Sequence, residues 1–224
     1  RYLGLIHEEM GQLEPASKAY ERWAQLTEGE AEPYLRLGDV LYQADAFDQA
    51  VEAFLTASQI EESGPAYEGL SKCYYSQGRY PEALEANENW IELKPDDAGA
   101  SNSLGWTLYQ LERYNDAVKA FEHSVELAES ASAYEGLGTS HYARGAFQEA
   151  LKAYQKSVSL NPDNVELHNS VGLTLYQLGE YEKAIEAYNS SLAVAQNTQA
   201  HEGLGAVFFA MEDYRAALSK YQSL

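Results

Sequence analysis

The sequence predicts an all-α protein in which pairs of short helices stack into a solenoid. Apolar residues recur three and four positions apart, as they do on one face of a helix. Small residues recur at alternating spacings of 34 and 33 along the whole chain. A fixed period of this length is typical of a solenoid, in which each unit buries its apolar face against its neighbours.

The repeating unit is clearest in residues 131–162. Tyr134 lies in the first predicted helix and Tyr154 in the second. Gly145 falls between them, where the chain reversal needs a permissive backbone. Ala150 sets the register, and we number every repeat so that this residue is position 20. The equivalent residues are Ala16, Ala50, Ala83, Ala117, Ala184 and Ala217.

In chain order, the predicted repeats span residues 1–30, 31–63, 64–97, 98–130, 131–164, 165–197 and 198–224. The first begins at position 5, and the last ends inside its second helix. Solenoids usually end in polar capping repeats, and neither end shows one. We therefore expect a fragment of a longer protein, with apolar ends open to end-to-end self-association.

A second period of 67 residues runs through the array. The triplet Leu-Tyr-Gln begins at residues 41, 108 and 175, and Glu-Gly-Leu begins at residues 68, 135 and 202. Duplication of a two-repeat unit is the simpler explanation. A ligand that is itself periodic is the functional alternative.

Three further positions repeat with the same register. Position 8 is glycine except at Ser71, position 17 is Leu, Phe or Tyr, and position 24 is aromatic except at Asn87. The pattern resembles the tetratricopeptide repeat (TPR) family across essentially the whole chain, as seven repeats of which the first and last are incomplete. The resemblance implies a right-handed superhelix whose concave groove is lined by positions 2, 5, 9 and 13. The two departures affect the expected local packing.

The candidate binding residues are those that the resemblance places in or beside this groove. Position 12 supplies Tyr42, Tyr75, Tyr109, Tyr142, Tyr176 and Phe209. Position 5 supplies Glu68, Asn102, Glu135, Asn169 and Glu202, and position 13 supplies Gln110 and Gln177. Position 9 adds Trp106 and Leu173.

Each kind of residue has a functional and a structural explanation. Amides can pair with an extended peptide backbone, but a solvated polar face explains them equally well. Trp106 and Leu173 suggest a contact site because apolar residues surrounded by polar ones often mark interfaces, with helix packing as the alternative. We expect the tyrosine rings to pack against the next repeat and their hydroxyls to face the groove.

The net charge of −20 restricts the class of partner. It argues against a nucleic-acid backbone and an anionic membrane surface. No apolar run is long enough to insert into a membrane. TPR domains that clamp a terminal carboxylate use several cationic residues, whereas the groove positions here offer only Lys72 and Arg36 among acidic residues. The expected partner is a basic or polar protein or peptide.

No catalytic, cofactor or metal site is expected. Cys73 is the single cysteine and occupies a small, packed position, which favours an inert thiol. Of the five histidines, His168 and His201 are one repeat apart, but no third metal ligand is evident.

The sequence therefore predicts a non-catalytic protein–protein interaction scaffold. The alternative is a bacterial envelope protein that binds a polysaccharide chain or an export component, because tyrosine ladders stack on sugars. The cytoplasm is the default location, and the bacterial periplasm belongs to the alternative.

Overall fold

A computed structural model describes residues 1–27 and 29–223. These residues form no strand, and their helices are α1 Tyr2–Glu9, α2 Leu13–Leu26, α3 Glu32–Gln43, α4 Phe47–Ile60, α5 Gly64–Ser76, α6 Tyr80–Leu93, α7 Ala98–Gln110, α8 Tyr114–Leu127, α9 Ala131–Ala143, α10 Phe147–Leu160, α11 Val165–Gln177, α12 Tyr181–Val194, α13 Thr198–Ala210 and α14 Tyr214–Tyr221. The all-α class of stacked helix pairs is confirmed. Residues 28 and 224, in the first and last predicted repeats, lie outside the described residues.

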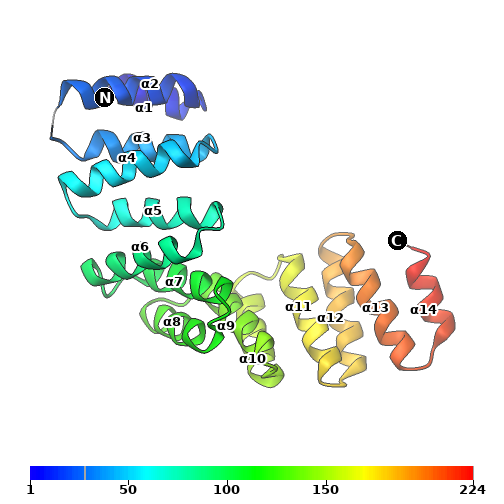
Figure 1. The fold of residues 1–224 in the computed structure, drawn as a ribbon. Coiled ribbons are helices and arrows are strands. Elements are labelled where there is room, and N and C mark those ends of the chain that lie inside the picture. The colour runs from blue at the N-terminus through cyan, green and yellow to red at the C-terminus, as the bar shows by residue number, and fades with distance from the viewer. Residues whose placement is uncertain (28, 224) are drawn as a thin grey trace. The chain divides into compact units, whose positions relative to one another are not determined.

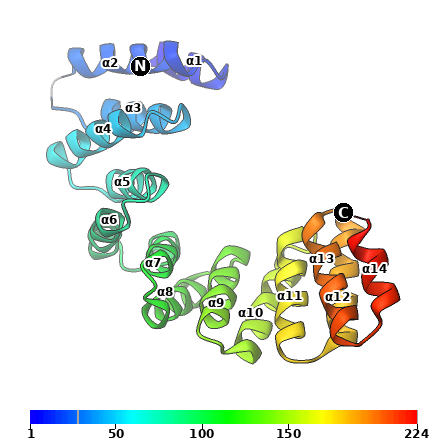
Figure 2. The same cartoon turned by 45° about the vertical axis from the view of Figure 1, so that its right-hand side comes forward.

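The chain forms two compact units, which we call unit 1 (Arg1–Glu112, α1 to α7) and unit 2 (Arg113–Leu224, α8 to α14). Within each unit, every helix packs against the next one along the chain, as Figure 1 and Figure 2 show. First helices of neighbouring repeats also touch, α3 with α5 and α5 with α7 in unit 1, and α11 with α13 in unit 2. We call the exposed side of these helices the first-helix face of each unit. A single superhelical array over the whole chain stays a prediction.

Local sequence signals set the helix boundaries. Asp97 accepts a hydrogen bond from the backbone N–H of Gly99 at 2.9 Å, and Asn164 accepts one from Leu167 at 3.0 Å, so both satisfy free donors at a helix start. The turn inside each repeat places position 15 at positive φ, which confirms the predicted role of Gly145. These residues are Gly11, Asp45, Gly78, Glu112, Gly145, Gly179 and Glu212.

The large residue at position 24 fills the space between neighbouring repeats. The Phe54 ring is almost fully buried between Gly38 of its own repeat and Gly69 of the next. A Cβ atom would approach the ring to 2.7 Å at Gly38 and to 2.4 Å at Gly69. The same close approach recurs between Gly136 and Phe121 and between Gly203 and Tyr188. Glycine of the next repeat thus faces the ring only at alternate junctions, in step with the 67-residue period.

The two departures from the repeat pattern in unit 1 lie in contact with each other. The buried Ser71 hydroxyl donates to Asn87 Oδ1 at 2.7 Å, and Asn87 Nδ2 donates to Thr107 Oγ1 at 2.9 Å. Ser103 Oγ lies 3.2 Å from Ser71 Oγ, and Thr107 in turn donates to the Ser103 carbonyl at 3.0 Å. A small hydrogen-bonded network thus replaces the glycine–aromatic contact found at this place in other repeats. Buried amides and hydroxyls are tolerated when they are paired in this way.

The surroundings of His141 predict that the stability of unit 2 depends on pH. Burial lowers the pKa of its imidazole below the ordinary 6.5 and the Arg144 guanidinium lowers it further, while Glu122 on α8 and Glu149 on α10 act in the opposite direction. The unfolded chain therefore binds the proton more readily than the folded one, so the free energy of unfolding should fall as the pH drops below about 6.5. We expect His141→Leu, which copies the Leu175 position, to show a smaller fall between pH 8 and pH 5.

Urea unfolding of both proteins at several pH values measures this effect. Carboxylates also titrate toward the acidic end, so the quantity of interest is the difference between the two curves rather than either slope alone. Parallel curves would mean that the His141 imidazole is equally basic in the folded and unfolded chains.

Candidate functional site

A pocket of ≈ 600 Å³ opens on the first-helix face of unit 1. Its lining residues are Tyr42, Glu68, Lys72, Tyr75, Ser76, Trp90, Gly99, Asn102, Ser103 and Trp106. Five of these, namely Tyr42, Glu68, Tyr75, Asn102 and Trp106, were candidate residues from sequence. They come from α3, α5 and α7, the first helices of three successive repeats. The pocket is of the size that holds small ligands or a few side chains.

Sequence reasoning missed Trp90, which lines the pocket from the second helix α6. Its indole is 6 % exposed and lies against two glycines. A Cβ atom would lie 3.2 Å from Trp90 Nε1 at Gly64 and 3.7 Å from Trp90 Cη2 at Gly99. Glycine at these places leaves room for the indole. The available signal was a tryptophan at position 27, where four of the other repeats have Ala57 or a serine.

The position-12 rings make a contact that was not expected. In five of the repeats the ring lies against the position-17 aromatic of its own repeat. The ring centroids are 5.5 Å apart for Tyr42–Phe47 and for Tyr75–Tyr80. The physical reason is that position 17 begins the second helix directly after the tight turn and so faces position 12 across it. The hydroxyls do reach the next repeat, where the Tyr42 hydroxyl lies 3.2 Å from Ser76 Oγ.

Gln110, an amide side chain predicted to line the groove, also bonds to a position-12 tyrosine. Its Nε2 donates to the Tyr75 hydroxyl at 3.0 Å, so one of its donors is used within the protein. Tyr109 is half-buried and packs edge-on to Trp106, with ring centroids 6.1 Å apart. Ring contacts and hydroxyl hydrogen bonds therefore hold Tyr42, Tyr75 and Tyr109 in place in the protein alone.

Charges of both signs lie around this pocket. Lys72 Nζ forms an ion pair with Glu68 across one helical turn of α5. Arg36, Lys72, Glu8 and Glu68 all act electrostatically on Asp39 of α3. The surroundings of the pocket in unit 1 are consequently mixed in charge, although the chain as a whole is strongly acidic.

The first-helix face of unit 2 is acidic and holds the remaining candidates. Burial raises the pKa of the Glu135 carboxyl, and the nearby Glu166 raises it further. Glu202 and Gln177 are exposed, Tyr142 and Tyr176 are half-buried, Leu173 is 38 % exposed and Phe209 is 63 % exposed. Positions 2, 5, 9, 12 and 13 of these repeats carry no lysine or arginine.

The expectation that Asn169 offers its amide to a partner is corrected. Asn169 is only 3 % exposed, and its Nδ2 donates to Asn197 Oδ1 and to Gln199 Oε1, both at 3.1 Å. Both acceptors belong to the start of the next repeat, where the polar residues before and within α13 close over position 5. The side chain therefore stabilises a junction between repeats.

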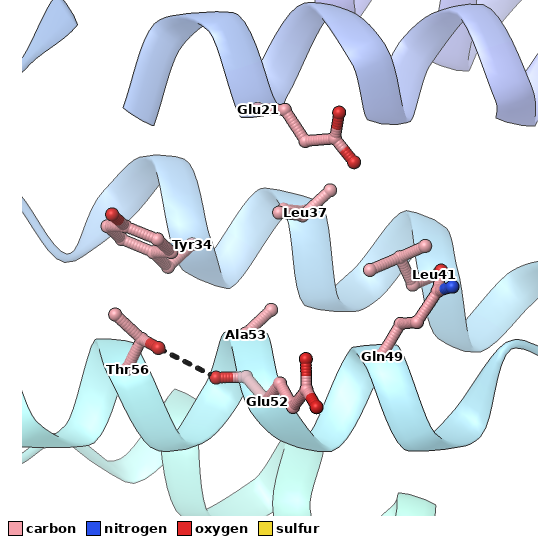
Figure 3. Close-up of a pocket in the computed structure, with 8 residues that line it drawn as sticks. All are labelled: Glu21, Tyr34, Leu37, Leu41, Gln49, Glu52, Ala53 and Thr56. Atoms are coloured by element: carbon pink, nitrogen blue, oxygen red, sulfur yellow. Dashed lines mark hydrogen bonds between the residues drawn. The ribbon is translucent and has the colours of Figure 1, made fainter. Parts of the chain in front are cut away.

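A second type of pocket lies between second helices, on the side opposite the first-helix face. In unit 1 it has a volume of ≈ 370 Å³ and is lined by Glu21, Tyr34, Leu37, Leu41, Gln49, Glu52, Ala53 and Thr56. Figure 3 shows the Glu21 and Glu52 carboxylates on either side of Leu37, and Thr56 Oγ1 bonded to the Glu52 carbonyl.

This second pocket recurs in unit 2 with a volume of ≈ 380 Å³. Residues at the same eight repeat positions line it, namely Gln155, His168, Val171, Leu175, Lys183, Glu186, Ala187 and Ser190. A hollow that returns with the same register and size reflects how the helices pack. The pocket at Trp90 and Trp106 instead depends on residues that are particular to one junction.

The residues that could act in catalysis or metal binding, namely Cys73, His168 and His201, are buried or hydrogen-bonded within the protein. Burial raises the pKa of the Cys73 thiol to about 12, so the thiol stays protonated at neutral pH, as the inert-thiol interpretation expects. The His168 imidazole lies 2.8 Å from the Pro162 carbonyl, and that of His201 lies 3.1 Å from Ser223 Oγ. Among residues 1–27 and 29–223, no three His, Cys, Asp or Glu side chains gather as metal ligands. In the same residues, no helix combines the length and apolarity that crossing a membrane requires.

Comparison with known families agrees with the repeat geometry. One tetratricopeptide repeat model matches residues 35–98 and 171–224, which is more than half of the chain. Another tetratricopeptide repeat model matches residues 98–132, and a TPR repeat model matches residues 138–179. The chain belongs to the tetratricopeptide repeat family. TPR domains bind proteins and peptides and are typically non-catalytic, and none of the matched families is an enzyme family.

Individual relatives share the fold at low sequence identity. Heat shock protein STI1 of Saccharomyces cerevisiae is 27 % identical over 110 residues, which cover 48 % of this chain and 19 % of STI1. The match therefore spans about a fifth of that curated relative. A tetratricopeptide repeat protein from Parabacteroides merdae has a TM-score of 0.77 at 15 % identity, covering 98 % of this chain and 88 % of the other.

Two further crystal structures are similar over most of their length. PilW, a widely conserved type IV pilus biogenesis factor, has a TM-score of 0.79 at 16 % identity, covering 87 % of this chain and 91 % of PilW. YrrB, a TPR protein with an unusual peptide-binding site, has a TM-score of 0.68 at 21 % identity, covering 83 % of this chain and 97 % of YrrB. These likenesses identify the TPR fold, and this chain is a TPR protein–protein interaction domain.

Proposed function

We propose that this chain is a non-catalytic scaffold whose first-helix face in unit 1 holds an extended segment of a partner protein. The observation that supports this most is the pocket in which Trp90 and Trp106 meet Tyr42 and Tyr75. Large aromatic side chains inside a polar rim are the usual centres of binding energy in protein interfaces. The rim is also held in place internally, which lowers the entropy lost on binding.

The acidic first-helix face of unit 2 supports a partner that is basic outside the anchored segment. Glu135, Glu166 and Glu202 lie at positions 5 and 2 of its repeats, and the chain carries a net charge of −20. Attraction between complementary charges steers association, and salt screens this attraction. We therefore propose basic or polar stretches in the partner, with their binding weaker at high ionic strength.

Tryptophan fluorescence can test the proposal. In a Trp23→Phe background, only Trp90 and Trp106 remain, and both line the pocket. Peptides selected from a random library would be titrated against this protein at low and high salt. We expect Trp106→Ala to raise their dissociation constants about tenfold or more, as the loss of a central aromatic contact does. Leu55→Ala, at a 38 % exposed leucine on the second helix α4 that does not line the pocket, is the matched control and should change them less than threefold.

Other outcomes would point elsewhere. If the library yields no saturable binder, or if Trp106→Ala and Leu55→Ala act alike, the unit 1 face is not the partner site. A fluorescence change with neutral or acidic oligosaccharides alone would support the polysaccharide alternative. Sedimentation measured at each peptide concentration separates peptide binding from end-to-end self-association.

A further inference from the structure

We infer that the unit 1 pocket takes a large, neutral apolar side chain of the partner, such as Phe, Leu, Met or Trp, and rejects Lys and Arg. The inference rests on the proposed function and specifies the chemistry of its central contact. It runs against the acidic composition of the chain, which by itself favours a cationic anchor stacked on an indole.

The walls of the pocket favour an apolar occupant. The indole of Trp90 is seated against Gly64 and Gly99, and Trp106 also lines the pocket, from α7. The Tyr42 and Tyr75 hydroxyls are already bonded, to Ser76 and to Gln110. These two tyrosines therefore offer mainly their rings to a ligand. Aromatic surface that is desolvated by an apolar side chain contributes through burial and ring contacts.

The charges at the rim disfavour a cationic occupant. Lys72 and Glu68 both line the pocket, and Lys72 Nζ is bonded to Glu68 Oε1. A Lys or Arg side chain over the indoles would therefore lie beside an ammonium group of the same sign. The carboxylate that would stabilise it is already neutralised by that ammonium. A cation enclosed by the indoles would also lose its hydration, a cost that cation–π attraction alone does not offset.

An anionic occupant is disfavoured because a carboxylate of the pocket would repel it. The Lys72 ammonium is already bonded to Glu68, so an incoming carboxylate meets an acidic group beside an engaged cation. Like charges brought together at an interface select against wrong partners. A neutral side chain avoids both repulsions. The peptide backbone on either side of it stays near the polar residues of the rim.

A peptide series tests the inference directly. One library-selected peptide would be synthesised with Phe, Leu, Ala, Lys, Arg or Glu at the position whose substitution by Ala weakens binding most. For the unmodified protein, we expect the Phe and Leu peptides to bind at least about tenfold more tightly than the Lys, Arg and Glu peptides.

The variant Lys72→Met supplies the decisive comparison. It removes the ammonium and frees Glu68, so the Lys and Arg peptides should gain about tenfold relative to the Phe peptide. Lys72 is exposed and its substitution should leave the fold intact, which circular dichroism would verify. Lys183→Met is the matched control, because Lys183 forms a similar helix-surface pair with Glu180 and neither residue lines this pocket. It should leave the order of the peptides unchanged.

The outcomes separate this inference from the proposed function. If the Lys or Arg peptide binds the unmodified protein as tightly as the Phe peptide, or if Lys72→Met leaves their ratio unchanged, the neutral-anchor inference is wrong while the site stands. If no peptide depends on Trp106 at all, the proposed site itself fails.

Discussion

Replacing Gly69 by alanine should lower the free energy of unfolding by about 2 to 4 kcal/mol. Helix propensity alone predicts the opposite sign, because alanine in a helix interior is favoured over glycine by about 1 kcal/mol. The packing term dominates here, since the new Cβ would lie 2.4 Å from Phe54 Cε1 and Cζ. The ring has little room to shift, because it is almost fully buried and also lies against Gly38, where an added Cβ would come within 2.7 Å of it.

Ser170→Ala is the matched control for this substitution. Ser170 occupies the same repeat position in α11 but already carries a Cβ, and its hydroxyl bonds only to the Glu166 carbonyl one turn earlier. Its substitution should change stability by less than about 0.5 kcal/mol. Urea unfolding followed by circular dichroism measures both variants. If Gly69→Ala proved as stable as the parent protein, the sandwiched ring would not be a determinant of the junction.

A second substitution separates steric conflict from other causes. Trimming the ring in Phe54→Leu opens a cavity and should itself destabilise unit 1. In the double variant Phe54→Leu, Gly69→Ala, the methyl group enters part of that cavity. The combined loss should therefore be smaller than the sum of the two single losses.

The register of the fold was predictable from sequence because it depends on local periodicity. Small residues at position 20 must be buried wherever two helices cross closely, and Ala16, Ala50 and Ala150 are indeed fully buried. The helix pairs follow from the same pattern. The glycine–ring contacts that follow the 67-residue period were not predictable, since they depend on which ring of one repeat meets which glycine of the next. Gly69 and Phe54 are 15 residues apart and touch only after the repeats stack.

The candidate site, like the fold, was only partly predictable from the sequence. Helical periodicity was enough to place Glu68, Asn102 and Trp106 on one face, and they do line one pocket. Trp90 was missed because it lies on a second helix and reaches the pocket past Gly99. Asn169 was assigned to the groove because residue type and position cannot show that Asn197 will cover it.

The mixed charge around the unit 1 pocket also shows why net charge is a poor guide to one site. A value of −20 describes how the molecule attracts partners over long distances. What a pocket accepts depends on the few groups in contact with the ligand. In unit 1 those groups include the Glu68–Lys72 pair, whereas the same face of unit 2 has carboxylates without a cation at the equivalent positions.

We expect strong energetic coupling between Ser71 and Asn87 when the hydrogen-bonded network around Asn87 is replaced by a glycine–aromatic contact. Asn87→Phe alone should lower the free energy of unfolding by about 2 to 4 kcal/mol, because the ring would collide with the Ser71 side chain. Ser71→Gly alone should cost about 2 kcal/mol, since Asn87 Oδ1 loses its donor and the helix gains a glycine.

The double variant Ser71→Gly, Asn87→Phe should recover most of this loss. It copies the junction in unit 2 where Gly138 faces the Tyr154 ring. The surrounding residues already match, because Ser170 and Thr174 stand there where Ser103 and Thr107 stand here. Phenylalanine is chosen because Thr139, which accepts the Tyr154 hydroxyl, is replaced by Lys72 in this repeat.

Urea unfolding of the four proteins gives the coupling energy, which we expect to reach about 2 kcal/mol or more. Simple addition of the two single losses would mean that Ser71 and Asn87 are independent departures from the repeat pattern. Strong coupling would show that one substitution made room for the other. In that case the polar junction is a second stable solution to the same packing problem, and it lies directly behind the pocket that Ser103 lines.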